Sequence, residues 1–361
     1  MSGAEAGARP LHPALQTRAC ALFGVELPIV QTGMGWVSGA RLTAATSAAG
    51  GLGILASATM TVEELRVAIG KVKERTDKPF GVNMRGDQLD AAERIELMIR
   101  EGIRVASFAG PPARQLIDKL KEAGIVTMPT VGMAKHAVKM QSWGVDAVIA
   151  QGHEGGGHTG PVPTSLLLPE VCRSVDIPVL GAGGFKDGRG LVAALAFGAE
   201  GIAMGTRFLL TQESQVPDAV KQRYLAADER STVVTEAIDG APQRVIQTEL
   251  IQRLERSGPL SRLLRAVRNA WVFRGLTGNS VGQILREGMA MRKTRGLTLA
   301  QLTMAANAPM LTRATMVDGN LEAGILPTGQ VTGIISQLPS VEEVLRSIVE
   351  EAEQTLGRLQ G

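Results

Sequence analysis

Eight short apolar segments constrain the fold of this chain more than any other feature of its sequence. They are rich in Val, Ile and Ala, and neighbouring segments begin 20 to 32 residues apart. Parallel strands need connections of a dozen or more residues, so this interval predicts strands alternating with helices around a parallel sheet. The predicted strands span residues 28–31, 52–55, 80–83, 105–108, 125–129, 146–151, 178–181 and 201–204.

Eight such strands favour closure into a (β/α)8 TIM barrel of the α/β class. The alternative is an open doubly wound sheet, whose first strand would lead into a G-x-G-x-x-G turn. Here the first strand leads into Thr32-Gly-Met-Gly35, and at residues 181–186 a lysine stands where the third glycine belongs. The barrel is therefore the preferred prediction, with the open sheet as its competitor.

Three segments follow from this pattern. Residues 1–212 are predicted to form the barrel. Residues 213–296 show no strand signal and are predicted to form a basic helical insertion (cap) after strand eight. Residues 253–295 carry ten basic and two acidic side chains, so the positive charge of the chain is concentrated there. Residues 297–361 end in a helix with Ser340 and Glu343 as a capping box, and this part is expected to close the barrel.

The composition is that of a globular protein, with 44% apolar and 20% charged residues. The cysteines, Cys20 and Cys172, form neither a disulfide framework nor a metal pair, which is typical of a reducing cytoplasm. No apolar run approaches the roughly 20 residues of a membrane span, and the N-terminus lacks the apolar core of a signal peptide. Without finger spacings or RNP-like aromatic motifs, nucleic acid is not an expected partner.

Residues that directly follow the strands of such a barrel form its active site. Gly183-Gly184 and Gly205-Thr206 follow predicted strands seven and eight, where backbone N–H groups of barrels commonly bind phosphate. Either pair alone is equally well explained as a tight turn without a ligand. The presence of both pairs, one after each of these two strands, favours a phosphate site.

The loop after strand six contains three consecutive glycines, 155–157, and then His158. Three glycines do not form a stable helix, so the loop can lie close to a flat ligand while the histidine projects from it. Histidine suits proton transfer near neutral pH. The alternatives are a solvent-exposed histidine or a metal ligand, but His153 lies five residues away and the glycines prevent the helix that H-E-x-x-H requires. No metal is expected, His153 is assigned a structural or peripheral role, and Glu154 is expected to orient the loop.

The remaining strand ends carry neutral groups. Met34, Gly35, Asn83 and Gln151 offer donors, acceptors and an apolar wall rather than charges, which fits the edge of a neutral heterocycle. One phosphate and one flat ring indicate FMN. The alternatives are a sugar-phosphate substrate or pyridoxal phosphate, although no predicted strand ends in the lysine that pyridoxal phosphate needs.

Six motifs in order over about residues 20–215 resemble the nitronate monooxygenase (2-nitropropane dioxygenase) family, which includes the flavin-dependent enoyl-acyl-carrier-protein reductases. They are Pro28-Ile-Val-Gln-Thr-Gly-Met-Gly-Trp36, Ala49-Gly-Gly-Leu-Gly-Ile54, Asp77-Lys-Pro-Phe-Gly-Val-Asn83, Gly155-Gly-Gly-His158-Thr-Gly160, Ala182-Gly-Gly184 and Met204-Gly-Thr-Arg-Phe208.

This resemblance implies noncovalently bound FMN and a catalytic role for His158. Its implied cofactor-binding residues are Gly33, Met34, Asn83, Thr130, Gln151, Gly156 and Gly157 for the ring, with Gly183, Gly184, Gly205 and Thr206 for the phosphate. Nitronate-oxidising members often carry a lysine near the position of Thr130, so this chain is closer to the enoyl reductase pattern. The basic segment and the Pro327-Thr-Gly-Gln330 sequence look most like actinobacterial CoA-thioester dehydrogenases of steroid-ring breakdown. Gln330, Arg265, Arg268, Arg292 and Lys293 are the predicted substrate residues.

The sequence therefore predicts an FMN-dependent oxidoreductase acting on the α,β carbons of an acyl-CoA thioester. Hydride would pass between the β-carbon and flavin N5, while His158 exchanges the α-proton. The alternatives are a nitronate monooxygenase that oxidises alkyl nitronates with O2, and an FMN carrier without turnover. The substrate is a small molecule, and a homodimer is kept as an option for the assembly.

Overall fold

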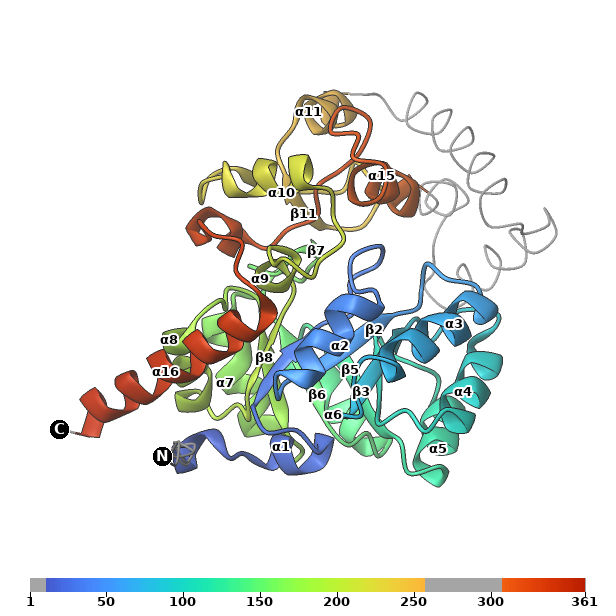
Figure 1. The fold of residues 1–361 in the computed structure, drawn as a ribbon, viewed down its shortest axis with the longest axis vertical. Coiled ribbons are helices and arrows are strands. Elements are labelled where there is room, and N and C mark those ends of the chain that lie inside the picture. Colours follow the sequence, from blue (N-terminus) through green and yellow to red (C-terminus); the bar gives the residue numbers. More distant parts are fainter. Residues whose placement is uncertain (1–10, 257–306, 361) are drawn as a thin grey trace, which may run out of the picture.

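Eight parallel strands form a closed barrel in the computed structural model, which describes residues 11–256 and 307–360 (Figure 1). The barrel closes where β1 pairs with β9, with Ile29 opposite Ile202 and Gln31 opposite Met204. The predicted TIM barrel is confirmed, and the alternative prediction of an open sheet is wrong. The barrel strands are β1 (Ile29–Gln31), β2 (Leu52–Ala56), β3 (Phe80–Met84), β4 (Val105–Phe108), β5 (Val126–Val131), β6 (Val148–Gln151), β8 (Val179–Ala182) and β9 (Ile202–Met204).

Helices between the strands form the outer layer. The helix α3 begins at a capping box in which Glu64 N donates to Thr61 Oγ1 (3.2 Å) and Thr61 N donates to Glu64 Oε2 (2.7 Å). The helix α5 ends just before Gly124, whose φ of 71° is accessible to glycine at little cost. These helices are α2 (Ala40–Ala48), α3 (Val62–Lys73), α4 (Ala91–Arg100), α5 (Arg114–Glu122), α6 (Ala134–Ser142), α7 (Thr164–Ser174) and α8 (Gly188–Ala196). Within the described residues, no helix combines the length and apolarity that a bilayer crossing requires.

One end of the barrel is closed by apolar packing. The chain enters through η1 (Pro13–Leu15) and α1 (Arg18–Phe23), and Ala19 and Phe23 of α1 pack in one cluster with strand residues such as Ile54 and Ile149. Figure 1 shows α1 on the side of the barrel opposite to the segments that follow β9. The strands finish at the other end, which is the end where such barrels carry their active sites.

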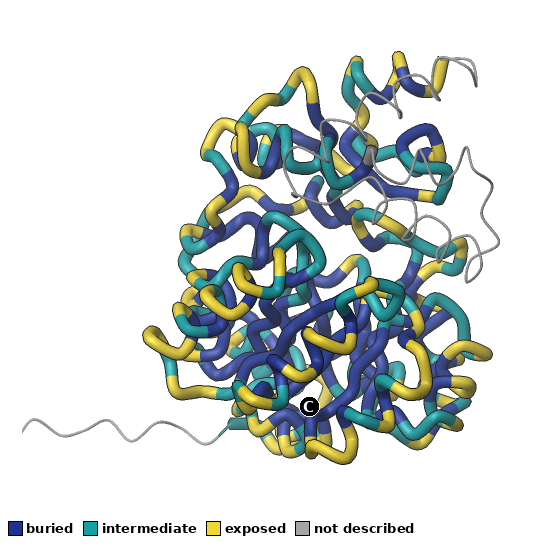
Figure 2. The backbone as a smooth tube through the Cα atoms, turned by 90° about the vertical axis from the view of Figure 1, so that its right-hand side faces the viewer, coloured by how far each residue is buried: buried dark blue, intermediate teal, exposed yellow. Residues whose placement is uncertain are grey.

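The segment after β9 lies above this open end, and Figure 2 shows it as a second layer with its own buried backbone. It contains α9 (Thr206–Leu209), α10 (Asp218–Leu225), β10 (Thr232–Thr235), β11 (Gln243–Ile246), α11 (Glu249–Arg256), α15 (Asn307–Met316) and η2 (Gln330–Ile334). The expectation of helices alone is wrong for residues 232–246. There β10 and β11 pair antiparallel, and β11 also pairs with β7 (Gly157–His158). Runs of β-branched residues on both sides of Asp239-Gly240 favour this hairpin.

The C-terminal helix α16 (Val341–Gln360) lies outside the sheet, against α8 and α2 (Figure 1). Its predicted capping box is confirmed, because Ser340 N donates to Glu343 Oε2 (2.7 Å) and Glu343 N donates to Ser340 Oγ (3.2 Å). The strands close through the pairing of β9 with β1, so the contribution of this part to closure lies in the outer ring of helices. Only the short helix α9 directly follows β9, and α16 fills the remaining place in the helical ring.

Candidate active site

The predicted site residues gather at the carboxyl ends of the barrel strands. Gly33, which follows β1, lies in direct contact with Asn83, the last but one residue of β3. A Cβ at Gly33 would be 2.2 Å from the Asn83 Cβ. Met34 reaches the loop after β9, with its Sδ 3.2 Å from the Cβ position of Gly205. Thr130 lies in β5 beside Ile149 of β6 and is half-buried.

Neutral polar groups hold the β1 and β3 ends in place. Ser38 Oγ accepts from the backbone N of Met34 (2.9 Å) and from Nε2 of the buried Gln31 (2.8 Å). Asn83 Nδ2 donates to Ser107 Oγ (3.3 Å), while the Asn83 carbonyl accepts from Ser57 Oγ (2.8 Å). The side chains that hold the β1 and β3 ends in place are therefore all uncharged.

The glycine loop after β6 is fixed at both ends. Gln151 Nε2 donates to the carbonyl of His158 (2.8 Å), which holds the loop in a closed turn. Glu154 accepts from the backbone N and the hydroxyl of Thr164 at the start of α7 (2.9 and 2.8 Å), so its predicted orienting role has a structural counterpart. Gly157 has a φ of 66°, a conformation that a side chain would strain.

The predicted phosphate loops offer open backbone donors. Gly183 and Gly184 have φ values of 92° and 84°, and Gly183 packs against the backbone of the glycine loop. Across the described ranges, the backbone N–H groups of Gly183, Gly184, Gly205 and Thr206 donate to no protein acceptor. Four such groups lie at the ends of β8 and β9, and this cradle of unpaired donors has the chemistry that an anion requires.

A strap of residues 327–330 crosses between these loops. Gly329 N donates to Thr206 Oγ1 (2.9 Å), and Gln330 N donates to the carbonyl of Glu154 (2.9 Å). The Thr206 hydroxyl also lies 3.4 Å from Thr328 Oγ1, whose own proton goes to the carbonyl of Gly329 (3.2 Å). The predicted substrate residue Gln330 is exposed, and its Nε2 lies 3.5 Å from the carbonyl of Glu229.

The predicted catalytic residue His158 lies on β7 and is paired with an acid. Its Nε2 lies 2.8 Å from Asp239 Oδ2, and Asp239 Oδ2 also accepts from Gln243 Nε2 (2.6 Å). Neither Asp239 nor Gln243 is among the residues predicted from the sequence. The β-branched runs at residues 232–235 and 245–246, on either side of Asp239-Gly240, are the local signal that could have indicated a hairpin here.

His153 is held differently from His158. Its Nδ1 lies 2.8 Å from the carbonyl of Gly160, and its own carbonyl accepts from Arg244 Nη2 (3.1 Å). These contacts agree with a structural role. The described ranges contain no group of three or more histidine, cysteine or acidic side chains placed to hold a metal.

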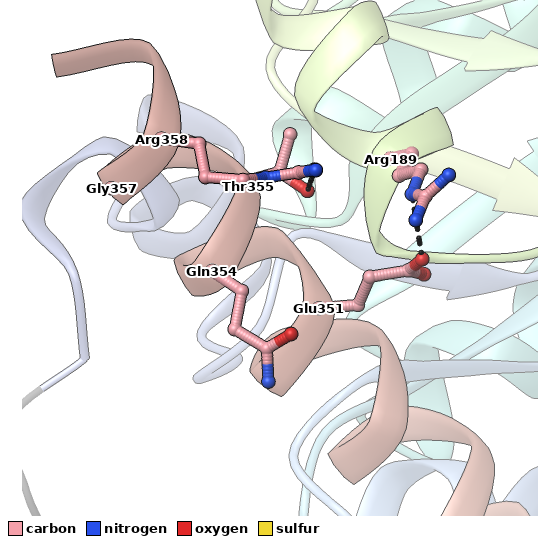
Figure 3. Close-up of a pocket in the computed structure, with 6 residues that line it drawn as sticks. All are labelled: Arg189, Glu351, Gln354, Thr355, Gly357 and Arg358. Atoms are coloured by element: carbon pink, nitrogen blue, oxygen red, sulfur yellow. Dashed lines mark hydrogen bonds and ion pairs between the residues drawn. The ribbon is translucent and has the colours of Figure 1, made fainter. Parts of the chain in front are cut away.

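The structure does not test four of the predicted substrate residues. Arg265, Arg268, Arg292 and Lys293 fall outside the described residues. A groove on the outer layer, between Arg189 of α8 and Glu351, Gln354 and Arg358 of α16, is shown in Figure 3. It is bridged by an ion pair between Arg189 and Glu351 (3.1 Å) and belongs to the packing of α16.

Comparison with known proteins identifies the family. The nitronate monooxygenase family model matches residues 16–351 of this chain. The chain belongs to the nitronate monooxygenase family. Its resemblance to that family in sequence motifs is thereby confirmed, and the protein is a flavin-dependent oxidoreductase.

Among characterised relatives, two have the name (3aS,4S,5R,7aS)-5-hydroxy-7a-methyl-1-oxo-octahydro-1H-indene-4-carboxyl-CoA dehydrogenase. The protein from Mycobacterium tuberculosis is 59% identical over 94% of this chain and 96% of its own length. The protein from Rhodococcus jostii is 56% identical over 96% and 98%. Among solved structures, FabK from Thermotoga maritima has a TM-score of 0.79 at 35% identity (96% and 99% covered). Nitroalkane oxidase from Streptomyces ansochromogenes has a TM-score of 0.73 at 27% identity (94% and 99% covered).

The residues at the barrel mouth fit the flavin of this family. A flavin phosphate requires several donors, and the cradle after β8 and β9 has four open N–H groups. The isoalloxazine ring requires close backbone approach and neutral polar groups, which Gly33, Asn83 and the glycine loop offer.

Proposed function

We propose that this protein is an FMN-dependent acyl-CoA dehydrogenase of the steroid-ring-degradation type, which acts on the α,β carbons of a CoA thioester. The observation that carries this proposal is the 56–59% identity, over nearly the whole chain, to two dehydrogenases whose names specify a carboxyl-CoA. Nitronate oxidation is the second candidate, because the family as a whole bears that name.

The proposal assigns roles to the residues already described. Gly183, Gly184, Gly205 and Thr206 would hold the FMN phosphate, and Gly33, Met34, Asn83, Thr130, Gln151, Gly156 and Gly157 would border the ring. Bound FMN would supply a two-electron acceptor or donor beside the acyl chain. His158 would remove or return the α-proton, because its side chain is 61% exposed at the open end of the barrel and hydrogen-bonded to an acid.

On this proposal, the basic segment 253–295 binds the CoA part of the substrate. CoA carries several phosphate charges at the end of a long arm, so a cluster of cations can bind the nucleotide while the thioester reaches the barrel mouth. On this proposal Arg265, Arg268, Arg292 and Lys293 contact the CoA phosphates, and Gln330 contacts the arm beside the glycine loop. A homodimer stays a prediction.

FMN, rather than FAD, is expected as the bound flavin. The single cradle of open donors suits one phosphate, and the sequence has no Rossmann fingerprint for an adenine nucleotide. Purified protein should be yellow and should release FMN on heating, as identified by chromatography of the supernatant. Release of FAD, or a colourless protein that gains no absorbance when FMN is added, would contradict the assignment.

Anaerobic flavin bleaching is the experiment that tests the function. We expect a bicyclic carboxyl-CoA to reduce the flavin, and the same acid on a short thioester without the nucleotide to do so with a kcat/KM lower by about tenfold or more, since the phosphate contacts are lost. The KM for the CoA substrate should rise with salt because exposed ion pairs are screened.

Each alternative makes a different prediction in that experiment. Bleaching by alkyl nitronates and not by CoA thioesters would assign nitronate oxidation instead. Equal use of the long and short thioesters, without salt dependence, would remove the proposed CoA contacts. A flavin that no substrate reduces would indicate a carrier.

A further inference from the structure

We propose that Asp239 is the positioning residue for His158 and that it selects Nδ1 as the ring nitrogen that exchanges the substrate proton. This inference rests on the proposed proton transfer by His158. It adds a residue from the insertion, outside the barrel, to the chemistry at the barrel mouth.

The geometry of Asp239 is that of a fixed acceptor. Its Oδ2 lies 2.8 Å from His158 Nε2 and accepts from Gln243 Nε2 (2.6 Å), while its Oδ1 accepts from the backbone N of Ala241 (3.2 Å). The Asp239 side chain is 7% exposed, whereas that of His158 is 61% exposed. A buried carboxylate with these donors stays in place while the imidazole faces accessible space.

The charge of Asp239 follows from the same contacts. Burial raises the pKa of this carboxyl, but the hydrogen bonds from His158, Gln243 and Ala241 outweigh burial, so its pKa lies below the ordinary 3.8. Because the pKa of Asp239 is lower in the folded state, this carboxylate stabilises the fold at pH values above its ordinary pKa. The stabilisation is lost as the pH falls through the pKa of the folded state. At neutral pH Asp239 is therefore an anion that only accepts hydrogen bonds.

An anionic acceptor at Nε2 determines the tautomer of a neutral imidazole. Nε2 carries the proton, and Nδ1 carries the lone pair. Nδ1 of His158 has no hydrogen-bond partner in the part of the chain that the structure describes. When Nδ1 takes a proton from substrate, the positive charge forms next to the Asp239 carboxylate and is stabilised by it.

Backbone pairing keeps the two residues together. His158 lies opposite Gln243 in the β7–β11 ladder, and Thr159 N donates to the carbonyl of Pro242 (3.1 Å). The hairpin that carries Asp239 is thus hydrogen-bonded to the strand that carries the histidine.

The other charged groups around the pair are engaged elsewhere. Among described residues these are Arg244 on β11 and Glu154 on the glycine loop, with His153 as the other titratable neighbour. Arg244 donates to the His153 carbonyl (3.1 Å) and Thr232 Oγ1 (3.0 Å), and Glu154 accepts from Thr164. Asp239 is the acid in contact with the imidazole.

The test compares Asp239→Asn, Asp239→Glu and the control Asp228→Asn. Asp228 is an exposed aspartate of the same insertion whose carboxylate accepts from Ser231 Oγ (2.7 Å). Asparagine presents one acceptor and one donor, so it no longer enforces a proton on Nε2. We expect Asp239→Asn to lower kcat by about 100-fold, Asp239→Glu to restore part of it, and Asp228→Asn to leave it unchanged.

Two readouts separate positioning from a structural role. Nitrogen-15 NMR of His158 in flavin-free protein above neutral pH should show the Nε2–H tautomer in the unaltered chain and lose that preference in Asp239→Asn. The second readout is rescue by the conservative variant, because Asp239→Glu keeps an anionic acceptor and should regain the Nε2–H tautomer together with part of kcat. An unchanged tautomer in Asp239→Asn, or no regain of either in Asp239→Glu, overturns the inference.

These readouts also distinguish the inference from the proposed function. If His158→Ala removes activity while Asp239→Asn keeps both rate and tautomer, only the positioning role fails. If the tautomer depends on Asp239 but His158→Ala keeps full activity, proton transfer by His158 fails and the inference falls with it.

Discussion

Replacing His158 with Ala is expected to lower kcat by about 100- to 10,000-fold while flavin stays bound, which is the usual cost of losing a positioned acid or base. The side chain hydrogen-bonds Asp239 rather than the cradle of Gly183, Gly184, Gly205 and Thr206, so its removal leaves the cofactor contacts in place. The measurement is kcat with the CoA substrate, together with the flavin content after gel filtration.

The control for this variant is His153→Ala. The His153 ring contacts the Gly160 carbonyl, and its backbone is held by Arg244 and Val162, so we expect less than about a tenfold loss of kcat. Equal losses in the two variants, or loss of flavin from His158→Ala, would contradict a catalytic role for His158.

A methyl group at Gly156 should abolish most activity, because the glycine loop and the strap are in backbone contact there. A Cβ at Gly156 would lie 2.4 Å from the Thr328 carbonyl carbon and 2.5 Å from Gly329 N. Gly329 is in turn bonded to Thr206, so one of the two segments must shift. We expect Gly156→Ala to lower kcat by about 100-fold or more, the scale of a misplaced catalytic group, and stability by about 1–3 kcal/mol.

Gly70→Ala is the matched control for Gly156→Ala. Gly70 lies inside α3, and nothing lies within 4 Å of its Cβ position. Alanine there should leave kcat unchanged and raise stability by up to about 1 kcal/mol, because alanine favours a helix more than glycine does. Thermal unfolding and kcat of the two variants check both expectations. A Gly156→Ala enzyme that resembles Gly70→Ala would show that the strap yields to the methyl group without moving the catalytic loop.

Features that depend on local sequence were predictable here. The barrel strands and the capping box of Ser340 and Glu343 each depend on residues within a few positions of one another, and both are confirmed. The barrel architecture also allowed the strand-end residues to be assigned to one edge of the sheet. Their individual contacts with flavin and substrate stay predictions.

Features that depend on distant pairing were not predictable. Asp239 is 81 positions from His158, and their contact requires both the hairpin and its register against β7. The capping box at Ser340 indicated the helix α16 correctly, but such a signal is the same whether a helix packs on a sheet edge or on other helices. It therefore did not specify that α16 completes the outer ring between α8 and α2 while β1 and β9 close the sheet.

The late position of α16 in the chain has a consequence for biosynthesis. It is translated only after residues 210–340, yet it covers α8 so closely that a Cβ at Gly188 would lie 2.3 Å from Ala352 N. Until α16 leaves the ribosome, the apolar surface that α8 and α2 present to it is exposed on the nascent chain. This long sequence separation raises the contact order and is expected to slow folding. Chaperone binding to the nascent barrel should therefore last until α16 docks, and ribosome stalling within the insertion should leave a barrel that proteases can cut.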